Sequence, residues 1–234
     1  FGLKFAAAAF TNLTQDHLDF HGTMDSYSQA KKILFDGLES DAIAITNADD
    51  SFGQIICSGS KAKRFSYSIG GGADVVATNV NLSLFGTSFN AIYQNSTREV
   101  SSPLIGKFNV QNILAAYATG IGLGIEPTKI IEGIANLKAV AGRFQQFASP
   151  NGWIAVVDYA HTHDAMENCL RAIHDILPKE KRGRIITVFG AGGNRDKAKR
   201  PKMGRVATEL SDITILTSDN PRFEKAEDII EDIK

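Results

Sequence analysis

Two histidines and two aspartates lie within six residues of one another, directly after an apolar run. They are Asp16, His17, Asp19 and His21. His17 and His21 are four positions apart, so on a helix they would share one face and could bind a metal ion. The alternative is structural, with the aspartates capping the next segment and the histidines forming local hydrogen bonds. The residue types alone favour the structural alternative, and a metal-dependent hydrolase stays open as a hypothesis.

Three further polar clusters follow apolar runs. Gly190-Ala-Gly-Gly-Asn-Arg195 offers backbone N–H groups and cations to an anion, although a solvated basic loop explains it equally well. It is close to the dinucleotide-binding string G-x-G-x-x-G of nicotinamide-dependent oxidoreductases, but Arg195 replaces the third glycine. Thr217-Ser-Asp-Asn-Pro-Arg222 ends in a guanidinium that could pair with a carboxylate. The last cluster is Asp158-Tyr-Ala-His161.

Such clusters can form one site if strands precede them, because ligands of open α/β sheets bind at the carboxyl ends of strands. Residues 5–10 predict a strand buried on both faces, and residues 42–45 predict another. Residues 65–100 favour antiparallel strands, and helices are expected from Asn109 and from Pro127. Thr23 is a typical N-cap. The spacing after it predicts a helix with an apolar stripe of Tyr27, Ala30, Leu34 and Leu38.

The pattern restarts after Gly142, which we therefore take as the boundary between domains 1–142 and 143–234. Strands are expected at 153–157, which should be buried, at 185–189 and at 213–216. Helices are expected at 164–177, ended by Pro178, and at 202–210 and 226–233. This alternation predicts βαβ units on a parallel sheet.

The composition excludes several classes of protein. The 234 residues are 43% hydrophobic and 22% charged, as in globular proteins, and the net charge of −1 argues against a nucleic-acid partner. No apolar run reaches the roughly 18 residues of a membrane span. Cys57 and Cys169 stand in unrelated settings, which favours a reducing cytoplasm. Because the chain starts at Phe1 without a leader, we expect it to be an internal segment of a longer protein.

Five strings occur in order along the chain. They are Thr11-Asn-Leu-Thr-Gln-Asp-His-Leu-Asp-Phe-His-Gly22, Gly106-Lys-Phe-Asn-Val-Gln-Asn112, Val157-Asp-Tyr-Ala-His-Thr162, Phe189-Gly-Ala-Gly-Gly-Asn-Arg-Asp-Lys197 and Ser218-Asp-Asn-Pro-Arg222. Together they resemble the Mur ligase family, from end to end of the chain. The resemblance implies an α/β protein, in which part of a P-loop-type ATP-binding domain, with a parallel and a small antiparallel sheet, precedes a Rossmann-like domain.

The resemblance also implies the reaction. Family members use ATP to phosphorylate a carboxylate, and the acyl phosphate is then attacked by an amine to form an amide bond. His17 matches a histidine that binds Mg²⁺, and Lys31 matches a catalytic lysine that is carbamylated and also binds the metal. Asn109 and Asn112 match residues that hold ATP.

In the second domain, Arg143 and Asp158 match ATP-binding residues and His161 matches a catalytic residue near the phosphates. Arg195, Asp219, Asn220 and Arg222 match residues that hold the amino-acid substrate. The Asp-Asn-Pro-Arg string implies meso-diaminopimelate as the amine, joined to a UDP-N-acetylmuramoyl dipeptide by a monomeric protein. A lysine-adding or folylpolyglutamate synthase-like ligase stays open as the alternative.

The sequence departs from the family pattern at two positions. His163 stands in place of the usual proline and Ala198 in place of a glycine. No G-x-x-x-x-G-K-[ST] string occurs, and the family's phosphate loop and uridine-nucleotide domain would precede Phe1. Further amine-binding residues would follow Lys234. We therefore expect the segment alone to be inactive.

Overall fold

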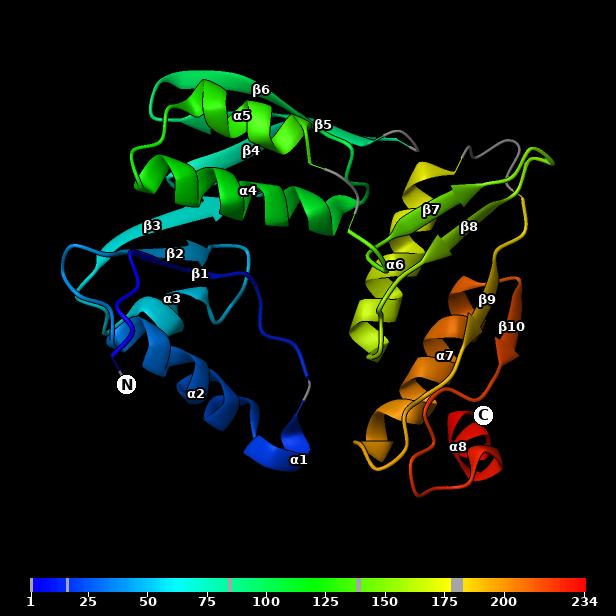
Figure 1. Ribbon diagram of the computed structural model, residues 1–234. Coiled ribbons are helices and arrows are strands. Elements are labelled where there is room, and N and C mark those ends of the chain that lie inside the picture. Colours follow the sequence, from blue (N-terminus) through cyan, green and yellow to red (C-terminus); the bar gives the residue numbers. More distant parts are fainter. Residues whose placement is uncertain (1, 16, 84–85, 138–139, 178–182) are drawn as a thin grey trace. The chain divides into compact units, whose positions relative to one another are not determined.

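The computed structural model describes residues 2–15, 17–83, 86–137, 140–177 and 183–234 (Figure 1). The chain divides into two compact units. The first consists of Phe1–Thr14 and Thr23–Ala139, and the second of Gln15–Gly22 and Val140–Lys234. The domain boundary at Gly142 stays a prediction, and each unit is described by itself.

A mixed sheet forms the centre of the first unit. In the described part of the chain its strands, in spatial order, are β1 (Ala7–Phe10), β2 (Ile43–Asn47), β3 (Lys63–Ser68), β4 (Val75–Ser83), β5 (Gly86–Tyr93) and β6 (Ser96–Ser102). The strands β1 to β4 pair in parallel and β4 to β6 pair antiparallel. The prediction of antiparallel strands is therefore confirmed for β4 to β6 and wrong for β3. Because β4 pairs with both β3 and β5, the parallel and antiparallel parts form one sheet.

Helices cover both faces of this sheet (Figure 1). They are α2 (Met24–Asp36), α3 (Gly53–Cys57), α4 (Lys107–Gly122) and α5 (Pro127–Ala135). Alternate residues of a strand point to opposite faces, so Ile45 of β2 joins the core under α4 and α5, whereas Ala44 joins the core under α2 and α3. Both side chains are fully buried. The unit is thus a three-layered α/β structure.

Two details of the first unit differ from expectation. The strand β1 buries Ala8 and Phe10 but exposes Ala9, because β1 lies at the edge of the sheet with only β2 beside it among the described residues. The helix α2 begins after Thr23, as predicted, and the Thr23 side chain accepts a hydrogen bond from the Ser26 N–H. Its predicted stripe is correct only in part, because Tyr27 and Leu38 pack in the core under α2 and α3, whereas Ala30 and Leu34 are exposed and Phe35 is buried.

The second unit has two separate pairs of strands in its described residues. The antiparallel pair is β7 (Gln145–Ala148) with β8 (Ile154–Val157), and the parallel pair is β9 (Ile186–Phe189) with β10 (Ile213–Leu216). The helices are α1 (Leu18–His21), α6 (His163–Ile176), the 3₁₀ turn η1 (Lys197–Lys199), α7 (Arg200–Leu210) and α8 (Ala226–Ile233).

The expected strands and helices of this unit are present, but their burial differs. The strand β8 is not a buried strand, because Ile154 and Val157 are exposed in a two-stranded sheet. It also pairs with β7 rather than with β9, so only β9, α7 and β10 form the expected parallel βαβ unit. Pro178, expected to end α6, lies outside the described residues.

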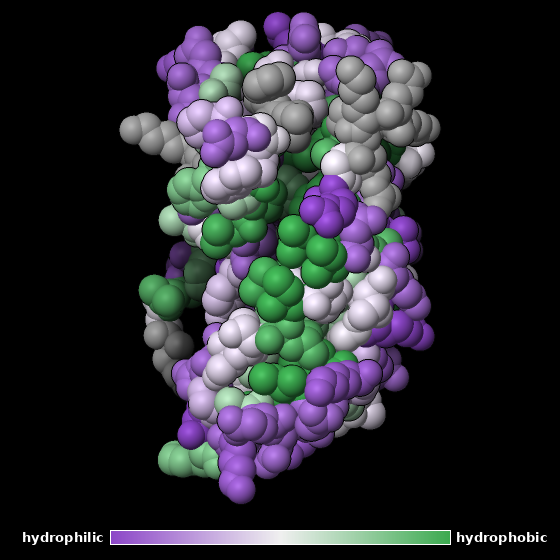
Figure 2. Space-filling view, turned by 90° about the vertical axis from the view of Figure 1, so that its right-hand side faces the viewer, coloured by the Kyte–Doolittle hydropathy of each residue, from purple (hydrophilic) through white to green (hydrophobic). Residues whose placement is uncertain are grey.

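One face of the parallel pair packs on helices and the other is exposed. Ile185, Met203 and Val206 belong to a core shared with α6. The outward, exposed side chains are Ile186, Val188, Ile213 and Ile215. Figure 2 shows hydrophobic surface on the side of the molecule that it views. None of the described helices is long and apolar enough to cross a membrane.

Candidate functional site

Two loops of the second unit, residues 190–195 after β9 and 217–224 after β10, are bonded through their backbones. The Gly193 N–H donates to the Asn220 carbonyl at 2.8 Å, and the Thr217 N–H donates to the Phe189 carbonyl at 3.0 Å. The approach is so close that only glycine fits. A Cβ at Gly193 would lie 1.9 Å from the Pro221 carbonyl oxygen, and one at Gly190 would lie 2.4 Å from that of Thr217.

This pairing corrects the idea that the glycine loop cradles an anion. Besides the Gly193 N–H, the Asn194 N–H is also engaged, with the Glu224 carboxylate at 2.5 Å. The glycines are required because a second loop packs on them, which is different from the close approach of a pyrophosphate. The geometry therefore argues against the nicotinamide-dependent alternative.

The two loops bring the predicted amine-binding residues together. The Arg222 Nη1 donates to the Gly193 carbonyl at 2.5 Å, and its backbone N–H to the Asn220 side chain at 3.3 Å. A Cβ at Gly192 would lie 3.8 Å from Arg222 Nη1 and 4.0 Å from Arg195 Cγ, so both arginines flank the same glycine. Asp219 and Asn220 lie exposed on the second loop. Arg222 and Asn220 are thus bonded to each other, and Arg195 and Asp219 lie exposed on the same two loops.

A buried ion-pair network beneath these loops was not expected from the sequence. Arg200 belongs to a run of cations that suggests solvent exposure, yet it is fully buried. Its guanidinium donates to Glu224 at 2.9 and 3.0 Å, to Asp232 at 2.7 Å and to the Gly192 carbonyl at 3.2 Å. Arg200 and other donors hold the pKa of Glu224 well below its usual range. Because the partners lie 24 and 32 positions away, no local signal could have identified the network.

The predicted nucleotide-binding residues of the second unit also meet. Asp158 accepts from the Phe144 N–H at 2.7 Å and from the Ala160 N–H at 2.8 Å. Arg143 lies over the ring of Tyr159 at 4.7 Å, and His161 meets the same ring edge-on at 5.0 Å. Tyr159, to which the sequence assigned no role, thus links Arg143 to His161.

His163, which stands in place of the proline usual in the Mur ligase pattern, lies next to this cluster. His163 is the first residue of α6, and Thr162 caps that helix by accepting from the Ala165 N–H. His163 Nδ1 is buried without a hydrogen-bond partner in the described part of the chain. The bonds to Asp158 form nonetheless.

In the first unit, α4 carries the two predicted asparagines. Asn109 is buried, and its amide donates to the Ile105 carbonyl at 2.8 Å. Asn112, which is exposed, donates to the Asn109 side chain at 3.2 Å. Asn109 therefore orients Asn112, and of the two only Asn112 is exposed to solvent.

The predicted metal-binding residues are placed differently. His17 precedes the one-turn helix α1 with a left-handed backbone, φ 55°, and is exposed. Lys31 is half-buried on α2, with its Nζ 4.9 Å from the Tyr27 ring centre. No group of three or more His, Cys, Asp or Glu residues is placed to hold a metal ion among the described residues, from which Asp16 is missing. The metal roles of His17 and Lys31 stay predictions.

A second polar network, also unexpected, lies at the carboxyl ends of the parallel strands of the first unit. Asp49 accepts from the Ser68 hydroxyl at 2.5 Å and the Ile69 N–H at 2.8 Å, and it interacts with Gln111 of α4. Burial alone would raise the pKa of Asp49, but these hydrogen bonds lower it below the usual range. Asp50 accepts from the Leu13 N–H at 3.0 Å. The turn after β2 thus holds both the segment that leads to His17 and the helix that carries Asn112.

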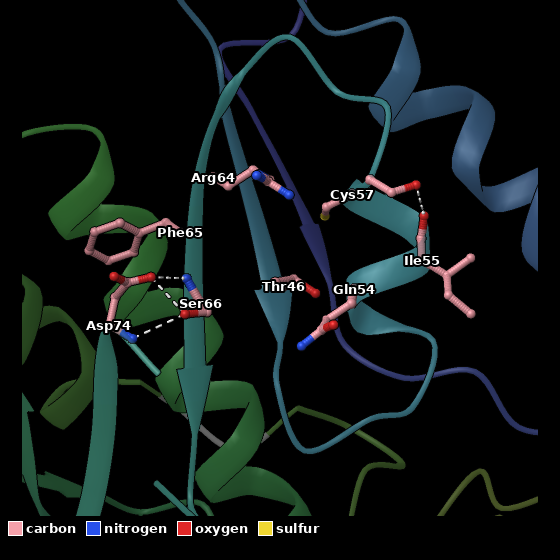
Figure 3. A pocket seen from close by; sticks show the side chains of 9 residues that line it. Thr46, Gln54, Ile55, Cys57, Arg64, Phe65, Ser66 and Asp74 are labelled. Atoms are coloured by element: carbon pink, nitrogen blue, oxygen red, sulfur yellow. Dashed lines mark hydrogen bonds between the residues drawn. The ribbon is translucent and has the colours of Figure 1, made fainter. Parts of the chain in front are cut away.

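A cavity of about 550 Å³ lies elsewhere in the first unit (Figure 3). Arg64, Phe65 and Ser66 of β3 line one side, and Gln54 and Ile55 of α3 the other. None of the residues predicted to be functional lines it. It is therefore separate from the clusters above.

Comparisons with known proteins cover the whole chain. The Mur ligase middle domain matches residues 1–120, and the Mur ligase glutamate ligase domain matches residues 142–234. The chain is 47% identical to UDP-N-acetylmuramoyl-L-alanyl-D-glutamate–2,6-diaminopimelate ligase from Parabacteroides distasonis and 46% identical to that from Phocaeicola vulgatus. Each match covers 99% of this chain, but only 46% and 47% of the relative. The chain spans about half the length of these relatives.

Solved structures agree with this fold. A structure of a UDP-N-acetylmuramoyl-L-alanyl-D-glutamate–2,6-diaminopimelate ligase is 34% identical, with a TM-score of 0.67 over 100% of this chain and 48% of its own. MurF from Acinetobacter baumannii, at 22% identity, shares the fold with a TM-score of 0.78 over 92% of this chain and 47% of its own. With both of its domain matches and these relatives, the chain belongs to the Mur ligase family.

Proposed function

We propose that the chain is part of an ATP-dependent ligase that joins meso-diaminopimelate to UDP-N-acetylmuramoyl-L-alanyl-D-glutamate in peptidoglycan synthesis. The relatives that match 99% of the chain carry the name of that reaction. The observation that carries the proposal is the pair of arginines, Arg195 and Arg222, that flank Gly192 at the ends of β9 and β10. Guanidinium groups at this edge suit an amine that also bears carboxylates.

The arginine pair favours a diacid amine over the alternatives. Lysine would bring its distal ammonium toward the Arg222 guanidinium, which repels it. A carboxylate there can pair with Arg222, whose guanidinium is already held by the Gly193 carbonyl. Rejection of a substrate that leaves a charged group unpaired is stronger than rejection by shape alone.

Residues of each unit can take part in nucleotide binding. In the first unit, the exposed Asn112 can present its amide to the base. In the second unit, Arg143 and His161, which lie against the exposed Tyr159 ring, can meet phosphate oxygens, and Asp158 can meet a ribose hydroxyl. ATP, when bound, supplies the phosphoryl group that converts a carboxylate into an acyl donor. Arg143 would neutralise charge on the phosphates, and Asp158 would keep its loop in place through the Phe144 and Ala160 N–H groups.

Magnesium is part of the proposal, with His17 and a carbamylated Lys31 as its residues. A carbamate would give the hard cation an oxygen ligand. The described residues alone do not complete a magnesium site, so no step above depends on the metal. We also propose a monomeric, cytoplasmic protein. We further propose that the 234 residues alone are inactive, because they contain no G-x-x-x-x-G-K-[ST] string.

A chimaeric ligase tests the proposal. The chain replaces the segment of the Parabacteroides distasonis ligase to which it aligns, and phosphate release and amide product are measured with meso-diaminopimelate and with L-lysine. We expect both products only with ATP, the nucleotide dipeptide and meso-diaminopimelate. Arg222→Ala should reduce use of meso-diaminopimelate selectively. Phosphate release that is indifferent to the amine, or an equal loss for both amines in Arg222→Ala, would refute the proposal.

A further inference from the structure

Two residues with unusual backbone conformations face each other across the paired loops. Asn194 and Arg222 both have a left-handed backbone, with φ of 50° and 51°. This region is uncommon for residues other than glycine, and its strain persists only where surrounding contacts impose it. The Phe223 N–H donates to the Asn194 side chain at 3.0 Å, so each left-handed residue is bonded to the opposite loop.

One carboxylate, that of Glu224, connects these constraints. Glu224 lies two positions after Arg222. The Glu224 backbone N–H donates to the Pro221 carbonyl at 3.0 Å, which closes the turn around Arg222. Its side chain accepts from the Asn194 N–H at 2.5 Å. The same carboxylate pairs with Lys197 at 3.0 Å and with buried Arg200 at 2.9 Å.

The form of the Arg200 network points to positioning rather than to stability. Burying a guanidinium costs more than an apolar side chain of similar size, so a buried ion pair is weak evidence for stabilisation. Arg200 Nε is even buried without a hydrogen-bond partner in the described part of the chain. Arg200 bonds to both loops, to Gly192 of one and to Glu224 of the other, and it also bonds to Asp232 of α8.

We propose that Glu224 is a positioning residue that determines which amine the site accepts. By holding Asn194 and Arg200, it keeps the turn at Arg222 in its left-handed conformation and aims the guanidinium at the distal carboxylate of the amine. The inference rests on the proposed function, since that function supplies the carboxylate. Loss of the Glu224 charge would leave Arg222 present but free to turn away.

Binding to the chimaeric ligase, in which the relative supplies the rest of the protein, tests this role without requiring catalysis. Meso-diaminopimelate and L-lysine are titrated separately into the chimaera, and calorimetry gives the dissociation constant of each. The variants are Glu224→Gln and, as a matched control, Glu209→Gln, whose carboxylate forms an exposed pair with Arg205 at 3.7 Å. We expect Glu224→Gln to weaken meso-diaminopimelate binding at least tenfold and lysine binding less than twofold, with no change in the control.

A second variant guards against misfolding of the first. Asn194→Gly removes the acceptor for the Phe223 N–H at an exposed position, leaves every charge in place and adopts the φ of 50° without strain. It should cause the same selective loss, and it decides the question if Glu224→Gln does not fold. An equal loss for both amines, or a lower melting temperature with unchanged preference, would show that Glu224 is only structural. A wild-type chimaera that does not bind meso-diaminopimelate would overturn the proposed amine, whereas a chimaera that binds it with a preference unchanged by Glu224→Gln would overturn the positioning role alone.

Discussion

Neighbouring glycines in the loop after β9 differ sharply in the room around them, and this difference predicts opposite outcomes for the same substitution. In Gly193→Ala, the new Cβ would lie 1.9 Å from the Pro221 carbonyl oxygen and 2.6 Å from its carbon. In Gly192→Ala, the nearest heavy atom would be Arg222 Nη1 at 3.8 Å, an ordinary contact. Both glycines have backbone angles that alanine can adopt. The comparison therefore isolates steric overlap.

The loss of stability in Gly193→Ala can be worked out from the separation of the two loops that the new Cβ would require. Overpacking against fixed atoms costs about 1–3 kcal/mol. Separation of the loops would also weaken the bond from the Gly193 N–H to Asn220, worth about 0.5–1.5 kcal/mol net. Reduced freedom of the unfolded chain stabilises both variants by about 0.4–1 kcal/mol and cancels in the comparison. Gly193→Ala should therefore be less stable than Gly192→Ala by about 2–4 kcal/mol.

Urea unfolding followed by tryptophan fluorescence measures this difference in the free energy of unfolding of the second unit. Trp153 is the only tryptophan of the chain and belongs to the second unit. For a unit of this size, the expected difference corresponds to roughly 8–30 °C in melting temperature. Free energies of unfolding that agree within about 1 kcal/mol for the two variants would refute the argument that the loops are in backbone contact.

Three further predictions concern other parts of the chain. Asp50→Asn should lower the free energy of unfolding by about 1–3 kcal/mol, because the single oxygen of an amide cannot accept from both the Leu13 and Phe52 N–H groups. The control variant Asp41→Asn, at an exposed position, should change it little. Equal effects of the two variants in urea titrations would contradict this. Because folding lowers the pKa of Glu224, its contribution to stability is present above its usual pKa of 4.5 and is lost as the pH falls below it. Urea midpoints between pH 6 and pH 3 should therefore fall less in Glu224→Gln than in wild type, and parallel curves would exclude this contribution. Burial, reinforced by nearby Asp158, raises the pKa of Cys169 to about 12, so on the order of 1 in 30,000 of its thiols is ionised at pH 7.5. Disulfide reagents should therefore react slowly with Cys169 until the chain is unfolded. Rapid labelling of Cys169 in the folded chain would contradict its burial.

The local signals of the sequence were reliable where a structure depends on neighbouring residues. Thr23 caps α2 because its hydroxyl needs only the N–H three positions later. The stripe of that helix was wrong at Ala30 and Leu34, because periodicity allows more than one face and packing against the sheet selects the face with Phe35. Similarly, the apolar run of β8 predicted a strand, but its burial depends on how many strands pair beside it.

Long-range partners explain what the sequence did not reveal about the candidate site. Arg200 looks like one cation of a basic run, and only the folded loops show that Glu224 and Asp232 enclose it. The glycines of the same loop look like an anion cradle, because the string does not show that a second loop will occupy the space. The motifs located the residues, whereas their physical roles depended on segments more than 20 positions away.

The contacts of Arg222 also bear on how an amine would be recognised. A guanidinium has five N–H donors, and the Gly193 carbonyl takes one of them at 2.5 Å, which restricts the rotation of the side chain. A flexible arginine would lose that freedom only on binding, at a cost of about 0.5–1.5 kcal/mol. Here folding has already restricted it. Recognition of a distal carboxylate would then depend on how firmly the two loops are joined, so substitutions beneath them should alter amine preference without touching the amine.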